Sequence, residues 1–190
     1  MKKLYLIVCL VICITTITMA QPKAIGLRLG YLSEVSYQHS FNENVFIELD
    51  LGANIWGFRE MNFSPTLNFS ISKPNWTPKG EWEFYAGPGL STGYNRHGGY
   101  IYENYNNSEN YFYLGLSGMF GLSYKFWFPL QVSVDFRPVL IGFATLGHKD
   151  KNGKVHGTSV YSDFYVPDYY GTHRIFYPNF GLSARYTFGR

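Results

Sequence analysis

The feature that most constrains the fold is the strict alternation of apolar and polar side chains in residues 179–188. Successive side chains of a β-strand point to opposite faces, so this stretch predicts a strand with one apolar face and one polar face. About ten such residues, tilted near 45°, cross the hydrocarbon layer of a bilayer. The apolar positions of this stretch are Phe180, Leu182, Ala184, Tyr186 and Phe188.

The same alternation recurs in earlier parts of the chain and predicts seven further strands. Their ranges are 25–31, 35–41, 45–55, 63–71, 82–94, 112–124 and 130–140. The first two strands come from one long stretch that we divide at Leu32-Ser33, because an undivided strand would give an odd number. The sequence therefore predicts an all-β fold, an eight-stranded antiparallel up-and-down transmembrane β-barrel. Pro65 has no N–H group to donate, so we expect a bulge or local break at that position.

The connections between these stretches differ greatly in length. The two longest, residues 95–110 and 144–174, both follow odd-numbered strands, whereas Asn42-Glu43-Asn44 and the connection near Phe128-Pro129 follow even-numbered strands. Short turns at one end and long loops at the other are typical of outer-membrane barrels. We therefore expect the long loops to be extracellular.

Residues 1–20 have the pattern of a cleaved signal peptide. Lys2 and Lys3 precede an apolar run, and Thr18-Met19-Ala20 provides the small residues of a cleavage site. Cys9 and Cys13 are the two cysteines of the sequence, so residues 21–190 contain none and offer no cysteine-based zinc or catalytic site. We expect residues 21–190 to form one domain. Its 14 basic residues (16 less two lysines) and 13 acidic ones give no basic excess for nucleic acid.

Alternation does not itself tell which face of the barrel meets solvent. A soluble lipocalin-like barrel would hide the apolar face, but the chain lacks the helix of that class. The polar positions are rich in small residues with charges of both signs, which suits the narrow interior of eight strands. Aromatic residues gather near strand ends, as in the girdles of membrane barrels. We place in the interior Arg28, Lys125, Arg137, Arg185, Glu34, Glu48, Asp50, Glu81, Glu83 and Asp135, and in the girdles Tyr31, Phe41, Trp82, Tyr94, Tyr124, Phe126, Tyr186 and Phe188.

Three segments carry a resemblance to a known family. They are residues 26–31 followed by 34–39, residues 82–89, and the terminal strand. With these segments the chain resembles the small eight-stranded outer-membrane barrels, the OmpX type and the transmembrane domain of OmpA, and most of all the Bacteroidetes type. The resemblance covers residues 21–190 and implies a Gram-negative outer membrane. It names no activity, and Gly189-Arg190 follow the aromatic residue on which such barrels often end.

No residue pattern points to catalysis, a cofactor or a metal. His97, His148, His156 and His173 fall in the two long loops without metal-ligand spacing. The single adjacent His-Ser pair, His39-Ser40, would point to opposite faces of a strand, which prevents the hydrogen bond that a catalytic pair needs. A catalytic pair formed across two strands stays open. We expect no enzyme, and no catalytic, cofactor-binding or metal-binding residue.

The expected function is therefore that of a structural or surface-interaction protein of the outer membrane, with a packed polar interior. Its expected partners are outer-membrane lipid and lipopolysaccharide, with an external protein or polysaccharide at the two long loops. These loops are rich in tyrosine, which suits recognition surfaces, although an aromatic fringe beyond the membrane is an equally good interpretation. A narrow passive channel and a lipid A-modifying enzyme remain alternatives. We expect a monomer.

Overall fold

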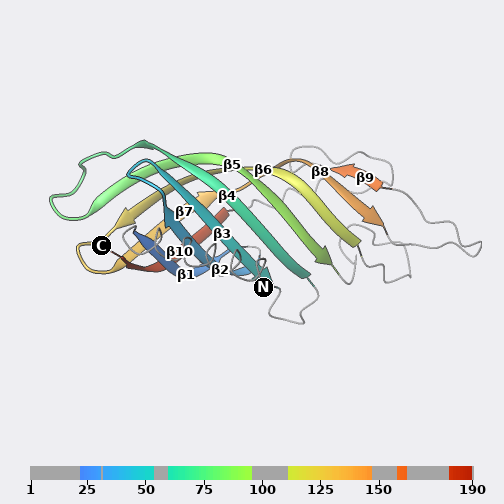
Figure 1. Ribbon diagram of the computed structural model, residues 1–190, viewed down its shortest axis with the longest axis horizontal. Helices are drawn as coiled ribbons and strands as arrows, with labels where there is room; N and C mark the ends of the chain where they lie inside the picture. Colours follow the sequence, from blue (N-terminus) through green and yellow to red (C-terminus); the bar gives the residue numbers. More distant parts are fainter. Residues whose placement is uncertain are drawn as a thin grey trace, which may run out of the picture.

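The strands close into a barrel in a computed structural model, which describes residues 22–30, 32–53, 60–95, 111–146, 158–161 and 180–189 (Figure 1). Each strand pairs antiparallel with its neighbours, β5 pairs with β6, and the first strand pairs with the last. No helix in the described residues is long and apolar enough to cross a membrane. The strands are β1 (Lys23–Leu29), β2 (Ser33–Ser40), β3 (Val45–Ala53), β4 (Glu60–Ser72), β5 (Glu81–Asn95), β6 (Tyr111–Lys125), β7 (Leu130–Phe136), β8 (Val139–Leu146), β9 (Thr158–Tyr161) and β10 (Phe180–Phe188).

The ten strands form the eight continuous strands of the barrel wall that the alternation predicts. We call each continuous strand a stave. β7 and β8 form one stave, because both pair with the same edge of β6 and only Arg137 and Pro138 separate them. β9 and β10 form another stave, because β9 pairs with β8 and β10 pairs with β7 on the edge that faces away from β6. The division at Leu32-Ser33 is confirmed, since a tight corner (Gly30 N to Leu32 O, 3.1 Å) joins β1 to β2.

The strand register fixes the tilt of the barrel. Followed from Leu29 through β2 to β5, the pairing reaches Phe112 of β6, and followed through β10 and β7 it reaches Leu122. These two residues of β6 lie ten positions apart, which is the shear of the barrel. Eight staves with this shear tilt by about 40°, so each residue advances about 2.5 Å along the axis.

The side-chain pattern has the polar face inside. Leu27, Val134 and Leu182 are more than half exposed on the outer wall, whereas Glu48, Asp50 and Arg185 have at most 1% of their surface exposed. The prediction of which parity faces the lumen is therefore confirmed for the central staves. Large apolar residues cover the outer wall, and the buried apolar residues of the described ranges include a small cluster of Phe46, Tyr85 and Met119.

Two local expectations are wrong. β4 passes Pro65 in continuous register with β3, and its register shift against β5 lies instead between Ser70 and Ser72. The residues 144–174, expected as one loop, contain strand structure, because β8 continues to Leu146 and pairs with β9.

The seventh stave is longer and less regular than expected. Arg137 and Pro138 interrupt it without a change of register, because Phe136 pairs with Phe120 and Val139 pairs with Ser117. One extra residue in β8, Leu140, then shifts the register against β6 between Leu116 and Ser117. Leu140 and Ile141 consequently both face outward, at 52% and 43% exposure, and the outward parity changes from even to odd numbers, as a β-bulge requires.

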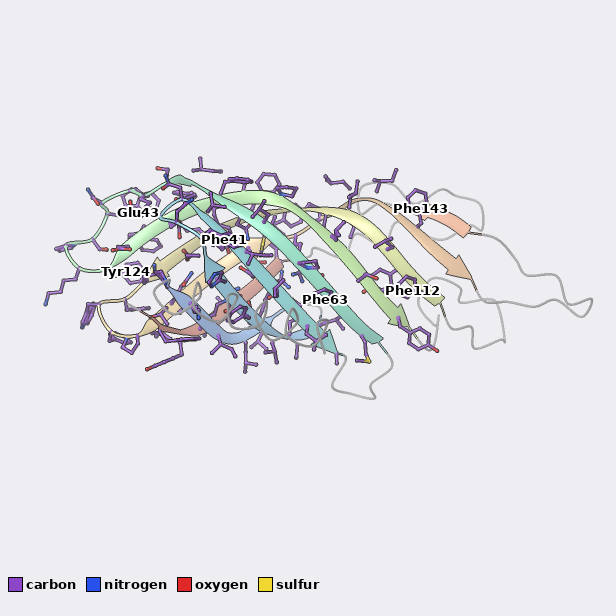
Figure 2. The ribbon with its side chains drawn as sticks, viewed as in Figure 1. Phe41, Glu43, Phe63, Phe112, Tyr124 and Phe143 are labelled. Carbon is purple, nitrogen blue, oxygen red and sulfur yellow. The ribbon has the colours of Figure 1, made fainter. Side chains whose placement is uncertain are left out.

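The signal peptide and the central part of each long loop lie outside the described residues. β5, β6, β8 and β9 project beyond the level at which β1, β2 and β10 end (Figure 1). Phe112 and Phe143 are on these projecting strands (Figure 2).

Candidate functional site: the charged interior of the barrel

The buried ionic groups of the barrel come from five neighbouring strands. β1, β2, β3, β7 with its following residue, and β10 direct every second side chain inward, which brings three arginines and four carboxylates of the described residues together. Each of these side chains is at most 6% exposed. The set is Arg28, Glu34, Glu48, Asp50, Asp135, Arg137 and Arg185.

One group of ion pairs is centred on Glu34 of β2. Arg28 Nη1 donates to Glu34 Oε2 at 2.7 Å, and Arg137 Nη2 donates to both carboxylate oxygens at 2.6 and 2.7 Å. Arg28 also donates to Asp135 Oδ1 through Nε (2.8 Å) and Nη2 (2.5 Å). Arg137 Nη1 donates to Asp50 Oδ2 at 2.6 Å. This Glu34 cluster, comprising these five residues, connects β1, β2, β3 and the β7–β8 stave.

A second group of contacts is centred on Arg185 of β10. Its three donor nitrogens reach Ser36 Oγ at 2.9 Å, Ser133 Oγ at 2.8 Å and Glu48 Oε1 at 2.6 Å. Gln38 Nε2 donates to the other oxygen of Glu48 at 2.6 Å. This Arg185 cluster, comprising these five residues, connects β10 on one side of the barrel with β2, β3 and β7.

Opposite these clusters, the buried residues described on β4, β5 and β6 are neutral. A Cβ atom on Gly121 of β6 would collide with the ring of Tyr85 of β5, so the glycine provides the space in which that ring lies. Beside this ring, Asn68 Nδ2 lies 3.5 Å from Met119 Sδ, and Phe46 meets Tyr85 edge-on at 5.3 Å between ring centroids. The charged side chains thus extend from one side of the lumen toward a neutral wall.

This arrangement links several strands through ion pairs in the lumen. A buried guanidinium or carboxylate without a partner would cost several kcal/mol, and here each has at least one ionic partner within 2.7 Å. The contacts tie together strands that are far apart in the sequence, such as β1 and β7.

Three of the residues predicted for the interior do not join these clusters. Glu81 is 72% exposed and Lys125 is 31% exposed, with 3.9 Å between their charged atoms. Glu83 is 17% exposed and lies 3.9 Å from Lys73. The prediction that these three side chains lie in the barrel interior is therefore wrong. They share the inward parity, but they lie at the end of β5 and β6, where water reaches them.

Aromatic rings form a continuous set of contacts at the same end, near the turns between β4 and β5 and between β6 and β7. Trp82 and Tyr124 are 4.7 Å apart between centroids, and Tyr124 and Phe126 are 4.6 Å apart. Trp76 adds a contact to Trp82 at 5.4 Å, and Lys79 Nζ lies 5.8 Å from the ring of Trp127. Parity identifies the strand-end rings, but Trp76 and Trp127 lie in turns that alternation does not describe.

The candidate histidines give no assembled site in the described residues. His39 pairs across the strands with Lys23 and Ile47, and its ring meets Phe41 edge-on at 5.3 Å. Within the described ranges no group of three or more His, Cys, Asp or Glu side chains could hold a metal ion. His97, His148, His156 and His173 lie outside those ranges, as do most of the tyrosines of the long loops.

Comparisons with known proteins find similarity to a solved outer-membrane protein structure. No protein-family model matches the chain, and no curated protein matches it. The fold is similar to the crystal structure of a major outer membrane protein from Thermus thermophilus, at 13% sequence identity and a TM-score of 0.45. The similarity covers 88% of this chain and 97% of that chain.

Proposed function

We propose that this protein is an integral barrel of a Gram-negative outer membrane with a closed interior, and that its role is structural or surface-interactive. The observation that carries the proposal is the inverted distribution of side chains. Large apolar residues of the described strands are about half exposed on the outer wall, while three arginines and four carboxylates are buried inside the barrel. A soluble monomer rarely exposes a contiguous apolar patch above a few hundred Å².

A closed barrel also satisfies the backbone requirement of a membrane. Hydrocarbon offers no hydrogen-bond partners, so a spanning sheet must have no open edge. Pairing between β1 and β10 supplies that closure. The signal peptide predicted over residues 1–20 supports export, and the eight staves with aromatic residues near the turns support an outer-membrane barrel of the OmpX and OmpA type.

The test of this proposal is folding of the full chain into phospholipid vesicles. We expect the inserted protein to resist added protease over its strands and to migrate faster in an unheated gel than in a heated one. A folded chain that stays in the aqueous phase without vesicles would contradict the proposal.

The packed lumen supports a structural role over a channel. Arg28, Arg137 and Arg185 reach across it to ionic partners, and all three are at most 6% exposed. We expect no steady single-channel conductance in a planar bilayer. Reproducible conductance steps in the wild-type protein would favour the passive channel instead.

The remaining roles concern lipid and external partners. We propose that the protein is a monomer without enzymatic activity that contacts lipopolysaccharide, and that loops 95–110 and 144–174 bind an external protein or polysaccharide. Mass analysis of lipid A from cells with and without the protein tests the enzyme alternative, because an acyl change would reveal it. Deleting residues 97–109 should abolish surface binding while insertion is retained, and unchanged binding would contradict the loop proposal.

A further inference from the structure

The outer apolar wall of the barrel has very different heights on its two sides. On β6 it runs from Phe112 to Tyr124, a rise of twelve residue steps or about 30 Å along the axis. Along this wall Leu114 and Leu116 are exposed, and aromatic rings lie at both ends. This height exceeds the apolar band of about 25 Å typical of outer-membrane barrels.

On β1 the wall is short. Its apolar residues are Ile25, Leu27 and Leu29, and from the level of Lys23 to Leu29 the strand rises by six residue steps or about 15 Å. It ends there because Gly30 and Leu32 close the corner into β2. On the adjoining strands, Val35 of β2 and Leu182 of β10 are the outward residues beside this corner, at 51% and 57% exposure.

The register shows that this difference lies at the long-loop end. At the tilt given above, each step to the next strand along the pairing direction rises by about 3 Å. Phe112 lies five strands from Leu29 in register, so it is about 16 Å higher along the axis. Tyr124 is then level with Lys23 within about 1 Å, so the two walls begin at the same height.

A flat hydrocarbon layer cannot match both walls. If it covers the wall of β6, the corner closed by Gly30 and Leu32 lies near its middle, although this backbone is not part of a strand. Irregular backbone facing lipid does not occur in the hydrocarbon region. Lipids instead deform around a short hydrophobic wall.

We propose that the β1–β2 corner thins the bilayer beside it, so that phospholipid headgroups and water descend to Gly30–Leu32. The barrel then has a full-height lipid contact along β6 and a compressed one along β1, β2 and β10. This inference rests on the proposed membrane location. The partner that we infer for the outer face of β1 and β2 is a locally thinned layer of phospholipid.

Spin labels at two outward positions test the inference. In the full chain carrying Cys9→Ser and Cys13→Ser, Leu29→Cys marks the short wall and Leu116→Cys marks the tall one. Leu116 is about 6 Å higher along the axis than Leu29, so a flat bilayer with its upper surface above Leu116 places Leu29 deeper. Thinning reverses that order.

The measurement is power-saturation EPR in dioleoyl-phosphatidylcholine vesicles, with oxygen and a nickel chelate as relaxants. We expect a severalfold higher ratio of nickel-chelate to oxygen accessibility at Leu29 than at Leu116, and a smaller contrast in dilauroyl-phosphatidylcholine. Val35→Cys gives a second reading of the corner if Leu29→Cys does not fold.

The outcomes separate this inference from the proposed function. Preferential oxygen accessibility at both Leu29 and Leu116 would show an embedded barrel without thinning, and would overturn the inference alone. Chelate accessibility at both positions, with no oxygen preference at either, would overturn the membrane location as well.

Discussion

The ion pair between Glu48 and Arg185 offers the sharpest test of the interior. Both side chains are fully buried. Their closest atoms are 2.6 Å apart, so the centres of the two charges are about 4 Å apart. At an effective dielectric constant near 20, that attraction is about 4 kcal/mol. The estimate agrees with the ~3–5 kcal/mol lost when one partner of a buried pair is removed.

The perturbation is a double-mutant cycle with Glu48→Gln, Arg185→Met and both together. Glu48→Gln leaves the guanidinium with two serine hydroxyls, whereas Arg185→Met leaves the carboxylate with Gln38. We expect each single variant to lose about 3 kcal/mol or more of unfolding free energy. The double variant should lose at least ~2 kcal/mol less than the sum, because it has no unpaired charge.

The assay is reversible urea unfolding of the protein in phospholipid vesicles, followed by tryptophan fluorescence. A cycle on Glu81 and Lys125 is the matched control, since these side chains are exposed and 3.9 Å apart, and we expect a coupling below ~1 kcal/mol. Additivity within ~0.5 kcal/mol for Glu48 and Arg185 would refute the reasoning, because coupled residues do not add.

Three further perturbations test the packing, the lipid-facing wall and the Glu34 cluster. Gly121→Val should lower the yield of folded protein in a gel-shift assay by collision with Tyr85, whereas Gly118→Ala, whose Cβ would be 3.6 Å from the nearest atom, should not. Val134→Arg on the outer wall should cost about 2–4 kcal/mol of unfolding free energy in vesicles, and Ile71→Arg near the turn end about 0–1 kcal/mol. Equal costs would argue against a depth-dependent lipid environment. Glu34→Ala leaves two arginines short of a partner, so it should destabilise the barrel in the same urea assay by at least ~3 kcal/mol, and no loss would contradict the bracing role.

Alternation is sufficient to predict most of the fold because every strand of a barrel has one face toward the lumen and one face toward the outside. Residues 45–53 illustrate this, since Glu48 and Asp50 point inward while Leu51 is 55% exposed. The division at Leu32-Ser33 followed from the requirement for an even number of strands.

What alternation could not predict depends on register and on a bulge. Arg28 and Asp135 are 107 residues apart in sequence, and they meet because β10 sets β1 and β7 in fixed register. The extra residue at Leu140 changes the outward parity, so a strand predicted to end at Leu140 continues to Leu146 with the opposite phase. Pro65 breaks no register because the β3 ladder continues past it.

The parity of a residue also does not predict its position along the barrel axis. Glu81 and Glu83 have the same phase as Tyr85, but only Tyr85 is deep in the lumen, at 1% exposure. Separating these residues requires the level of each strand end relative to its neighbours, which the closed pairing supplies.

The central claim is that lipid contacts the apolar wall and the charged side chains face the lumen. Residue-resolved mass spectrometry after photolabelling from a diazirine in the acyl chains, with the protein in vesicles, tests it most directly. The geometry predicts labels on Leu51, Val134 and Leu182 and none on Asp50, Asp135 or Arg185. Labels on the charged set, with the apolar set spared, would contradict it.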